Sequence, residues 1–236
     1  MKKLTKEERY AKKLAAMMSS LHEALEAWKA GERWNLYISE GNKKMGSVPS
    51  VSLLPLMTCS KACRETCGKN GCYAVKMAMF RGNVRKSWAR NTVLLMMSPQ
   101  KFYDDLYVWI MIHQPDSFRF NVAGDFANQS YFDIAVSVAA SCTKTHFLAF
   151  TREYEKVAVY IDYVGELPEN VHFVLSSWEG LETYNPYNLP ESVVLEPGSS
   201  IPEGVKLCGG NCFECKCHGV GCWALRQGEK IGFYKH

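Results

Sequence analysis

The 236-residue sequence lacks a long hydrophobic run and has little excess charge. No window reaches 18 apolar residues, so the sequence predicts no membrane span. The basic start, residues 1–13, is followed by a charged amphipathic pattern and not by an apolar segment, which argues against a secretory signal. The net charge of +4 is well short of that expected of a dedicated nucleic-acid binder. We therefore expect a cytoplasmic protein.

Proline is scarce, with 9 residues, whereas 47% of the residues are hydrophobic. This composition excludes a disordered or low-complexity chain and supplies enough apolar surface for one sizeable core. We expect an N-terminal helix and loop arm over residues 1–45 and an α/β core with the first cysteine group over 46–204. A cysteine-rich C-terminal segment, 205–236, is expected to pack on that core.

Predicted strands and helices alternate along the core. A capping box at Thr5 and Glu8 opens a predicted helix over residues 5–30. Apolar runs predict strands at 50–54, 118–122, 146–150, 171–176 and 192–195, with helices at 72–80, 84–97, 99–113, 129–141 and 153–163. This order predicts a mostly parallel α/β fold, either a partial (β/α) barrel or an open sheet. In both, functional side chains gather where the strands end, at Gly124, Asp125, Thr151, Arg152, Ser176, Ser177 and Glu196.

The ten cysteines are unusual for a reducing compartment, where closely spaced thiols hold metal more often than they form disulfides. Cys142 stands alone and is interpreted as a buried small side chain. The other nine form a first group, Cys59, Cys63, Cys67 and Cys72, and a second group, Cys208, Cys212, Cys215, Cys217 and Cys222. If Cys215 is set aside, the two groups have nearly the same spacing and both end in Cys-aromatic-Ala. We therefore predict two similar metal sites.

The kind of metal is inferred from the spacing. Zinc fingers favour two C-x2-C knuckles far apart, and neither group has that form. Packed spacings of three and four residues favour an iron–sulfur cluster, such as [4Fe–4S], over zinc, with disulfides as a third alternative. Predicted helix starts at Cys72 and Cys222 would lower the pKa of both thiols. The spacing leaves open whether Cys215 or Cys217 is the ligand in the second group.

Several further motifs carry a resemblance to a known family. They are residues 54–59, Cys72-Tyr73-Ala74, residues 118–126 with Tyr131, residues 147–152, and the closing Cys212, Cys215, Cys222-Trp223 and His236. With these motifs the chain, from about residue 45 to its end, resembles the phage and mobile-element family called gene product eighty-eight. It is more distantly similar to radical-SAM-like phage proteins with a Cys-Tyr-Ala motif. If a phage encodes it, the compartment is the host cytoplasm.

The resemblance implies an iron–sulfur cluster at the first group and S-adenosylmethionine beside it. Gly124 and Asp125 would stand where radical SAM enzymes receive the amino group of that cofactor, and Thr151, Ser176 and Glu196 would help to line its pocket. Asp125 and Arg152 are the candidate catalytic residues. One departure matters, because an open cluster needs three cysteines and the first group has four.

Two hypotheses follow for the function. The first is an iron–sulfur enzyme of the radical-SAM-like type, with the second cysteine group as an auxiliary centre. The second is a non-catalytic binding protein whose loops are held by zinc or closed iron–sulfur clusters. In that case the basic residues of the predicted helices at 72–80 and 84–97, and of the turn between them, would contact nucleic acid, together with Trp88; they are Lys76, Arg81, Arg85, Lys86 and Arg90.

Overall fold

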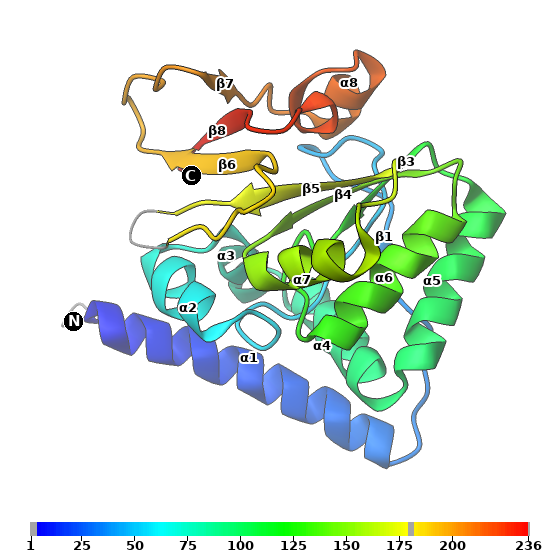
Figure 1. The fold of residues 1–236 in the computed structure, drawn as a ribbon. Coiled ribbons are helices and arrows are strands. Elements are labelled where there is room, and N and C mark those ends of the chain that lie inside the picture. Colours follow the sequence, from blue (N-terminus) through cyan, green and yellow to red (C-terminus); the bar gives the residue numbers. More distant parts are fainter. Residues whose placement is uncertain (1–3, 179–181, 236) are drawn as a thin grey trace.

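The computed structural model describes residues 4–178 and 182–235. Its centre is one eight-stranded sheet with the strand order β1-β2-β3-β4-β5-β6-β8-β7 (Figure 1). The strands are β1 (Ile38–Ser39), β2 (Ser50–Val51), β3 (Ser117–Phe120), β4 (His146–Thr151), β5 (Val171–Ser176), β6 (Glu191–Leu195), β7 (Val205–Leu207) and β8 (Lys230–Tyr234).

The strand pairing has the winding of a (β/α) barrel that does not close. Strands β2 to β6 lie side by side in chain order and all pair in parallel, whereas β1 is antiparallel to β2. Strand β8 extends the parallel sheet between β6 and β7. Since β1 and β7 form the two edges, the sheet is open. This confirms the predicted fold class, a mostly parallel α/β sheet.

Helices make the crossovers from β2 to β3, from β3 to β4 and from β4 to β5. The main helices are α1 (Lys6–Lys29), α3 (Tyr73–Phe80), α4 (Gly82–Met97), α5 (Pro99–His113), α6 (Gln129–Ser141) and α7 (Tyr154–Val164). The short ones are α2 (Lys61–Cys63), a π-helix (Arg64–Gly68), α8 (Cys212–Cys217) and a 3-10 helix (Gly221–Ala224). None of the helices in the described part of the chain is long and apolar enough to cross a membrane.

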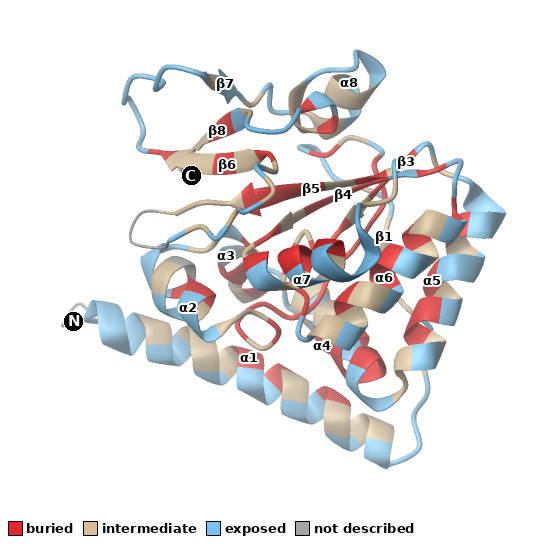
Figure 2. Cartoon of the chain, in the orientation of Figure 1, coloured by how far each residue is buried: buried red, intermediate tan, exposed pale blue. Residues whose placement is uncertain are grey.

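The two faces of the sheet are covered by different parts of the chain. Phe118 and Phe147 point to the face covered by α5, α6 and α7, where they join the largest hydrophobic cluster. Leu148 and Val174 point to the other face and pack with Trp223 of the C-terminal segment. Figure 2 shows β4 and β5 as largely buried. Successive side chains of a strand point to opposite faces, and here both faces are covered. Each central strand is therefore apolar at nearly every position, which is why continuous apolar runs predicted these strands correctly.

Helix α1 is confirmed almost to the residue. The Thr5 hydroxyl accepts from the Glu8 backbone N–H at 3.2 Å, and the Glu8 carboxylate accepts from the Thr5 N–H at 2.7 Å. The helix buries Met17 and Ala24 in a second hydrophobic cluster that includes residues of α3 and α4. The arm is thereby packed on the core.

The sequence pattern missed several short elements, the most important being β8. Its central Gly232 weakens the strand signal. In the structure a side chain there would collide with Leu195 of β6, since a Cβ would stand 2.7 Å from Leu195 Cδ1. The glycine thus allows β6 and β8 to pair. The predicted strands at 50–54 and 118–122 are shorter than expected, because the chain turns at their carboxyl ends toward the loops described below.

Asn91 of α4 joins three segments inside the core. Its side chain is fully buried. The amide Nδ2 donates to the carbonyls of Tyr37 at 2.8 Å and Ser52 at 3.1 Å, and Oδ1 accepts from the Tyr37 N–H at 2.9 Å. These bonds connect the segment before β1 to the residue after β2.

Replacing Asn91 with alanine should lower the free energy of unfolding by about 2–4 kcal/mol, because it leaves buried backbone groups without partners. Urea unfolding followed by circular dichroism measures the loss. The matched control is Asn83→Ala at the exposed start of the same helix, which should change stability by less than about 0.5 kcal/mol. Equal losses in the two variants would contradict this role for Asn91.

Candidate functional site

One large cavity lies on the face of the sheet opposite α5–α7 and reaches the carboxyl ends of the parallel strands. Its volume is about 510 Å³, within the range of small-ligand sites. A second pocket, under Val51 and Phe102, has about 10 Å³ and is large enough for at most one water molecule. The large cavity is therefore the candidate functional site.

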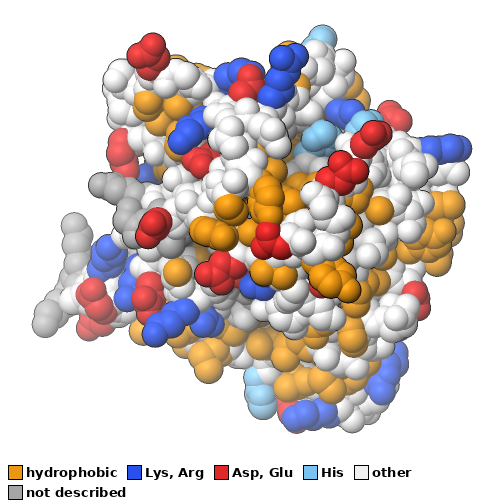
Figure 3. All heavy atoms as spheres, viewed as in Figure 1, with side chains coloured by type: hydrophobic (Ala, Val, Ile, Leu, Met, Phe, Trp, Pro, Cys, Tyr) orange, Lys and Arg blue, Asp and Glu red, His pale blue; other side chains and the backbone are white. Residues whose placement is uncertain are grey.

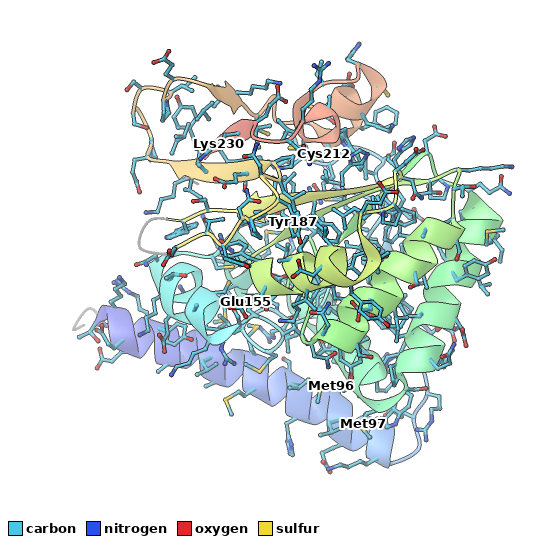
Figure 4. The ribbon with its side chains drawn as sticks, in the orientation of Figure 1. Met96, Met97, Glu155, Tyr187, Cys212 and Lys230 are labelled. Carbon is cyan, nitrogen blue, oxygen red and sulfur yellow. The ribbon has the colours of Figure 1, made fainter. Side chains whose placement is uncertain are left out.

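The outer helix face, where Met96 and Met97 are labelled in Figure 4, carries exposed hydrophobic side chains (Figure 3).

Side chains of the first cysteine group stand in the cavity wall. Cys59, Cys63 and Cys72 all line it. Cys63 ends α2, whose N-cap hydroxyl, that of Ser60, accepts from the Cys63 N–H at 3.2 Å. A hydrogen bond with Cys63, followed by burial, raises the pKa of the Cys59 thiol well above its usual value. The Cys67 side chain, also predicted to bind metal, lies outside the described part of the structure.

The loop that carries Cys59 is attached to the strand ends on both sides of this residue. On one side the Thr58 hydroxyl accepts from the Asp125 backbone N–H at 3.2 Å. On the other side the Ser60 N–H donates to the buried Glu153 carboxylate at 3.0 Å. Glu153 also forms an ion pair with Lys156. The ends of β3 and β4 therefore fix the position of the first cysteine.

Asp125 is buried where β3 ends, and both of its carboxylate oxygens accept hydrogen bonds. Oδ1 accepts from the Thr151 hydroxyl at 2.6 Å and from the Phe126 N–H at 2.9 Å, and Oδ2 accepts from the Arg152 N–H at 2.9 Å. Burial, with a smaller contribution from the charge of Glu153, raises the pKa of Asp125 to about 7. The carboxylate joins the ends of two neighbouring strands and lines the cavity.

The second cysteine group lies in the wall of the same cavity. Cys208, Cys212, Cys215 and Cys222 line it, and Figure 4 shows Cys212 where the C-terminal segment approaches the sheet. Cys217 is exposed and does not line the cavity. The alignment of the two groups by spacing left Cys215 out. In the structure, however, Cys215 lines the cavity with Cys208, Cys212 and Cys222. Helix α8 turns Cys217 away because residues two apart on a helix do not share a face.

The expectation of a lowered thiol pKa at Cys222 is wrong. Cys222 lies in a 3-10 helix of four residues, too short for a strong helix dipole. Burial, followed by the nearby Cys208, raises its pKa to about 12. Desolvation of the thiolate outweighs the effect of the helix start.

Each cysteine group has an arginine beside it. The Arg152 guanidinium donates to Cys63 Sγ at 3.7 Å and lies 5.4 Å from the ring centre of Trp178. The Arg119 guanidinium donates to Cys212 Sγ at 3.5 Å and lies 5.0 Å from the ring centre of Phe150. Arg119 was not among the residues predicted from the sequence. The available signal was a charged residue within the apolar run of β3, since such a residue is seldom buried without a partner.

The remaining predicted residues divide between the cavity and the surface. Gly124, Thr151, Ser176 and Ser177 line the cavity with Asp125 and Arg152. Glu196 does not line it; its carboxylate is exposed and forms an ion pair with Lys235 at 2.9 Å. Its place just after β6 was correct, but the chain turns its side chain outward. Among the described residues, no three or more His, Cys, Asp or Glu side chains form a group that could hold a metal ion as the structure stands.

Two of the five basic residues proposed to contact nucleic acid are engaged within the fold. Arg85 donates to the Ser20 hydroxyl and to the Ala78 carbonyl. Arg90 pairs with Glu32 and lies over the ring of Trp34. The proposed aromatic partner, Trp88, packs against the cluster under α1. Lys76, Arg81 and Lys86 are exposed.

Fold and site together define an open α/β barrel protein with two cysteine groups in the wall of one cavity. Residues 2–201 match the family model described as gene product 88. The chain therefore belongs to this phage protein family. The match includes the N-terminal arm and ends before the second cysteine group, which corrects the expected extent from about residue 45 to the end. No curated protein and no solved structure matches the chain.

Gly124 adopts a positive φ of 77°, and a Cβ there would lie 2.5 Å from Thr58 Oγ1 and 2.8 Å from Leu53 Cβ. Gly124→Ala should therefore lower the free energy of unfolding by about 2–4 kcal/mol, through backbone strain and overpacking. Gly198→Ala is the matched control, since Gly198 has a φ of 83° but no atom within 4 Å of its Cβ position. It should cost about 1 kcal/mol. Equal costs, measured by urea unfolding, would show that the close contact at Gly124 is unimportant.

Proposed function

We propose that the protein is an iron–sulfur enzyme of the radical-SAM-like type, with one cluster at each cysteine group. The observation that carries this proposal is the shared cavity, into whose wall both groups place their thiols beside polar strand ends. A protein that used its cysteines only to hold loops together would not need both groups to face one cavity of small-ligand size.

The charges around the cavity fit two anionic clusters. Asp125 is the one acidic side chain among the described lining residues. Five basic residues also line the cavity, Lys44, Lys76, Arg119, Arg152 and Lys235, of which Lys235 is paired with Glu196 outside the lining. Cysteines bind metal as thiolates, so clusters held by three or four of them would add negative charge. The excess of positive charge in the cavity wall would balance it. The two arginines that donate to Cys63 and Cys212 are the kind of hydrogen-bond donor that surrounds metal-bound thiolates.

In this proposal Cys59, Cys63 and Cys72 would hold the first cluster, and three protein ligands would leave one iron free for the cofactor. A reduced cluster there would supply the electron for radical chemistry with S-adenosylmethionine. Gly124 lets the chain pass close to Thr58, and Asp125, Thr151 and Ser176 present polar groups to the cofactor. Arg152 would donate to the Cys63 thiolate. Cys208, Cys212, Cys215 and Cys222 would hold the second cluster as an auxiliary centre.

Anaerobically purified protein should be brown, with absorption near 400 nm, as expected for iron–sulfur clusters. The double variants Cys59→Ala/Cys72→Ala and Cys208→Ala/Cys222→Ala should each lose about half of the bound iron and sulfide, because each cluster has its own ligands. Cys217→Ala, outside the cavity, should lose none. Circular dichroism must accompany the analysis, since metal binding also stabilises the fold. A colourless zinc protein would instead support the non-catalytic binding protein.

Adding S-adenosylmethionine to the reduced, iron-loaded protein should change the electron paramagnetic resonance signal of the first cluster, because ligands on an open iron alter that signal. The signal that persists in Cys208→Ala/Cys222→Ala is the one to follow. If the carboxylate contacts the cofactor, Asp125→Asn should raise the cofactor concentration needed for half of this spectral change roughly 10-fold, which corresponds to about 1.4 kcal/mol of binding free energy. An unchanged spectrum at large cofactor excess would favour a closed cluster with a structural or electron-carrying role.

A further inference from the structure

The rim of the cavity is formed in part by one face of α3. Tyr73, Lys76, Met77 and Phe80 all line the cavity, and they share one face because positions i, i+3, i+4 and i+7 of a helix lie on the same side. Two of them are strongly exposed aromatic residues, Tyr73 at 48% and Phe80 at 78%. The opposite face of the helix, with Val75 and Ala78, is buried. The apolar surface of the cavity therefore continues outward along α3.

The same region has an unusual charge distribution along the chain. Between Glu65 and Asp104 there is no acidic residue, although seven lysines and arginines occur there. Arg85 and Arg90 are engaged within the fold, Lys101 pairs with Asp105, and Lys69 lies near the ring of Tyr10. The other three have a different environment.

Lys76, Arg81 and Lys86 are exposed and form no ion pair with any residue that the structure describes. They occupy the cavity side of α3, the junction of α3 with α4, and the first turns of α4. Cations without partners next to exposed aromatic rings are the combination that binds single-stranded nucleic acid, through phosphate contacts and base stacking.

We infer that the cavity receives one nucleotide of a single-stranded nucleic acid whose neighbouring nucleotides lie along α3 and the start of α4. Tyr73 and Phe80 stack on bases at the rim, and Lys76, Arg81 and Lys86 neutralise phosphates. The cavity volume of about 510 Å³ is enough for one nucleotide and too small for a duplex. Enzymes that act on single bases likewise take one nucleotide into a pocket. The inference names the substrate class for the proposed enzyme and rests on that proposal, but the binding surface itself needs no metal.

Fluorescence anisotropy with labelled 12-nucleotide RNA and DNA of the same sequence tests this inference. Tyr73→Ala and Phe80→Ala should each weaken binding roughly 10-fold. The triple variant Lys76→Gln/Arg81→Gln/Lys86→Gln should reduce the slope of log affinity against log salt concentration by about 2. All these side chains are exposed, so circular dichroism should show unchanged folds.

Two control variants remove similar side chains elsewhere. Tyr163→Ala takes away a 91% exposed tyrosine of α7, and Lys144→Gln takes away an exposed lysine before β4, at the amino end of the sheet. Both should bind the oligonucleotides as the unchanged protein does. A labelled polyglutamate peptide of the same length should bind at least 10-fold more weakly. Absence of oligonucleotide binding, binding unaffected by the rim variants, or equal binding of the acidic peptide would overturn the inference.

Iron analysis of the same samples separates this inference from the proposed function. Iron-loaded protein that binds neither oligonucleotide overturns the inference and leaves the iron–sulfur proposal standing. Protein that binds through the rim but takes up no iron supports the inference and overturns the proposed enzyme. A preference for RNA over DNA, or the reverse, would identify which nucleic acid is the substrate.

Discussion

Parallel pairing of β2 with β3 and of β6 with β8 is the constraint on which the candidate site depends. Parallel strands present their carboxyl ends at one edge, so the segments that leave β2, β3, β4, β5 and β7 all meet there. The first cysteine loop follows β2, and the second group lies between β7 and β8. Two segments about 140 residues apart in the chain therefore share one cavity.

Within that frame, a small polar network determines the local geometry. Asp125 accepts from Thr151 and from the backbone of Arg152, while Glu153 accepts from Ser60. Buried carboxylates are costly unless their oxygens accept hydrogen bonds, and here each of them does so from groups that position the cysteine loop or the adjacent strand end. The hydrogen bonds of these buried groups therefore hold the Cys59 loop against the sheet. The same arrangement directs the Arg152 guanidinium toward Cys63.

The cavity wall combines two kinds of surface. Inner residues such as Phe150 and Phe233 give it aromatic character. Their rings lie edge to face, with 5.7 Å between the ring centres. Basic side chains from several elements surround the thiols, and the exposed face of α3 extends the wall outward. Under the proposed function, a wall of this kind would admit one nucleotide of a larger substrate beside the clusters.

Much of this was accessible from the sequence, because it depends on short-range patterns. Capping at Thr5, the helical periodicity of α5 and α6, and the apolar runs of β4 and β5 are local features, so the sequence predicted these elements with nearly exact bounds. Tertiary structure alone decided that Cys215 joins the second group in place of Cys217, that Glu196 pairs with Lys235 at the surface, and that Arg119 reaches Cys212. Spacing specifies which residues are near in the chain, whereas helix rotation, strand register and burial specify which side chains meet in space.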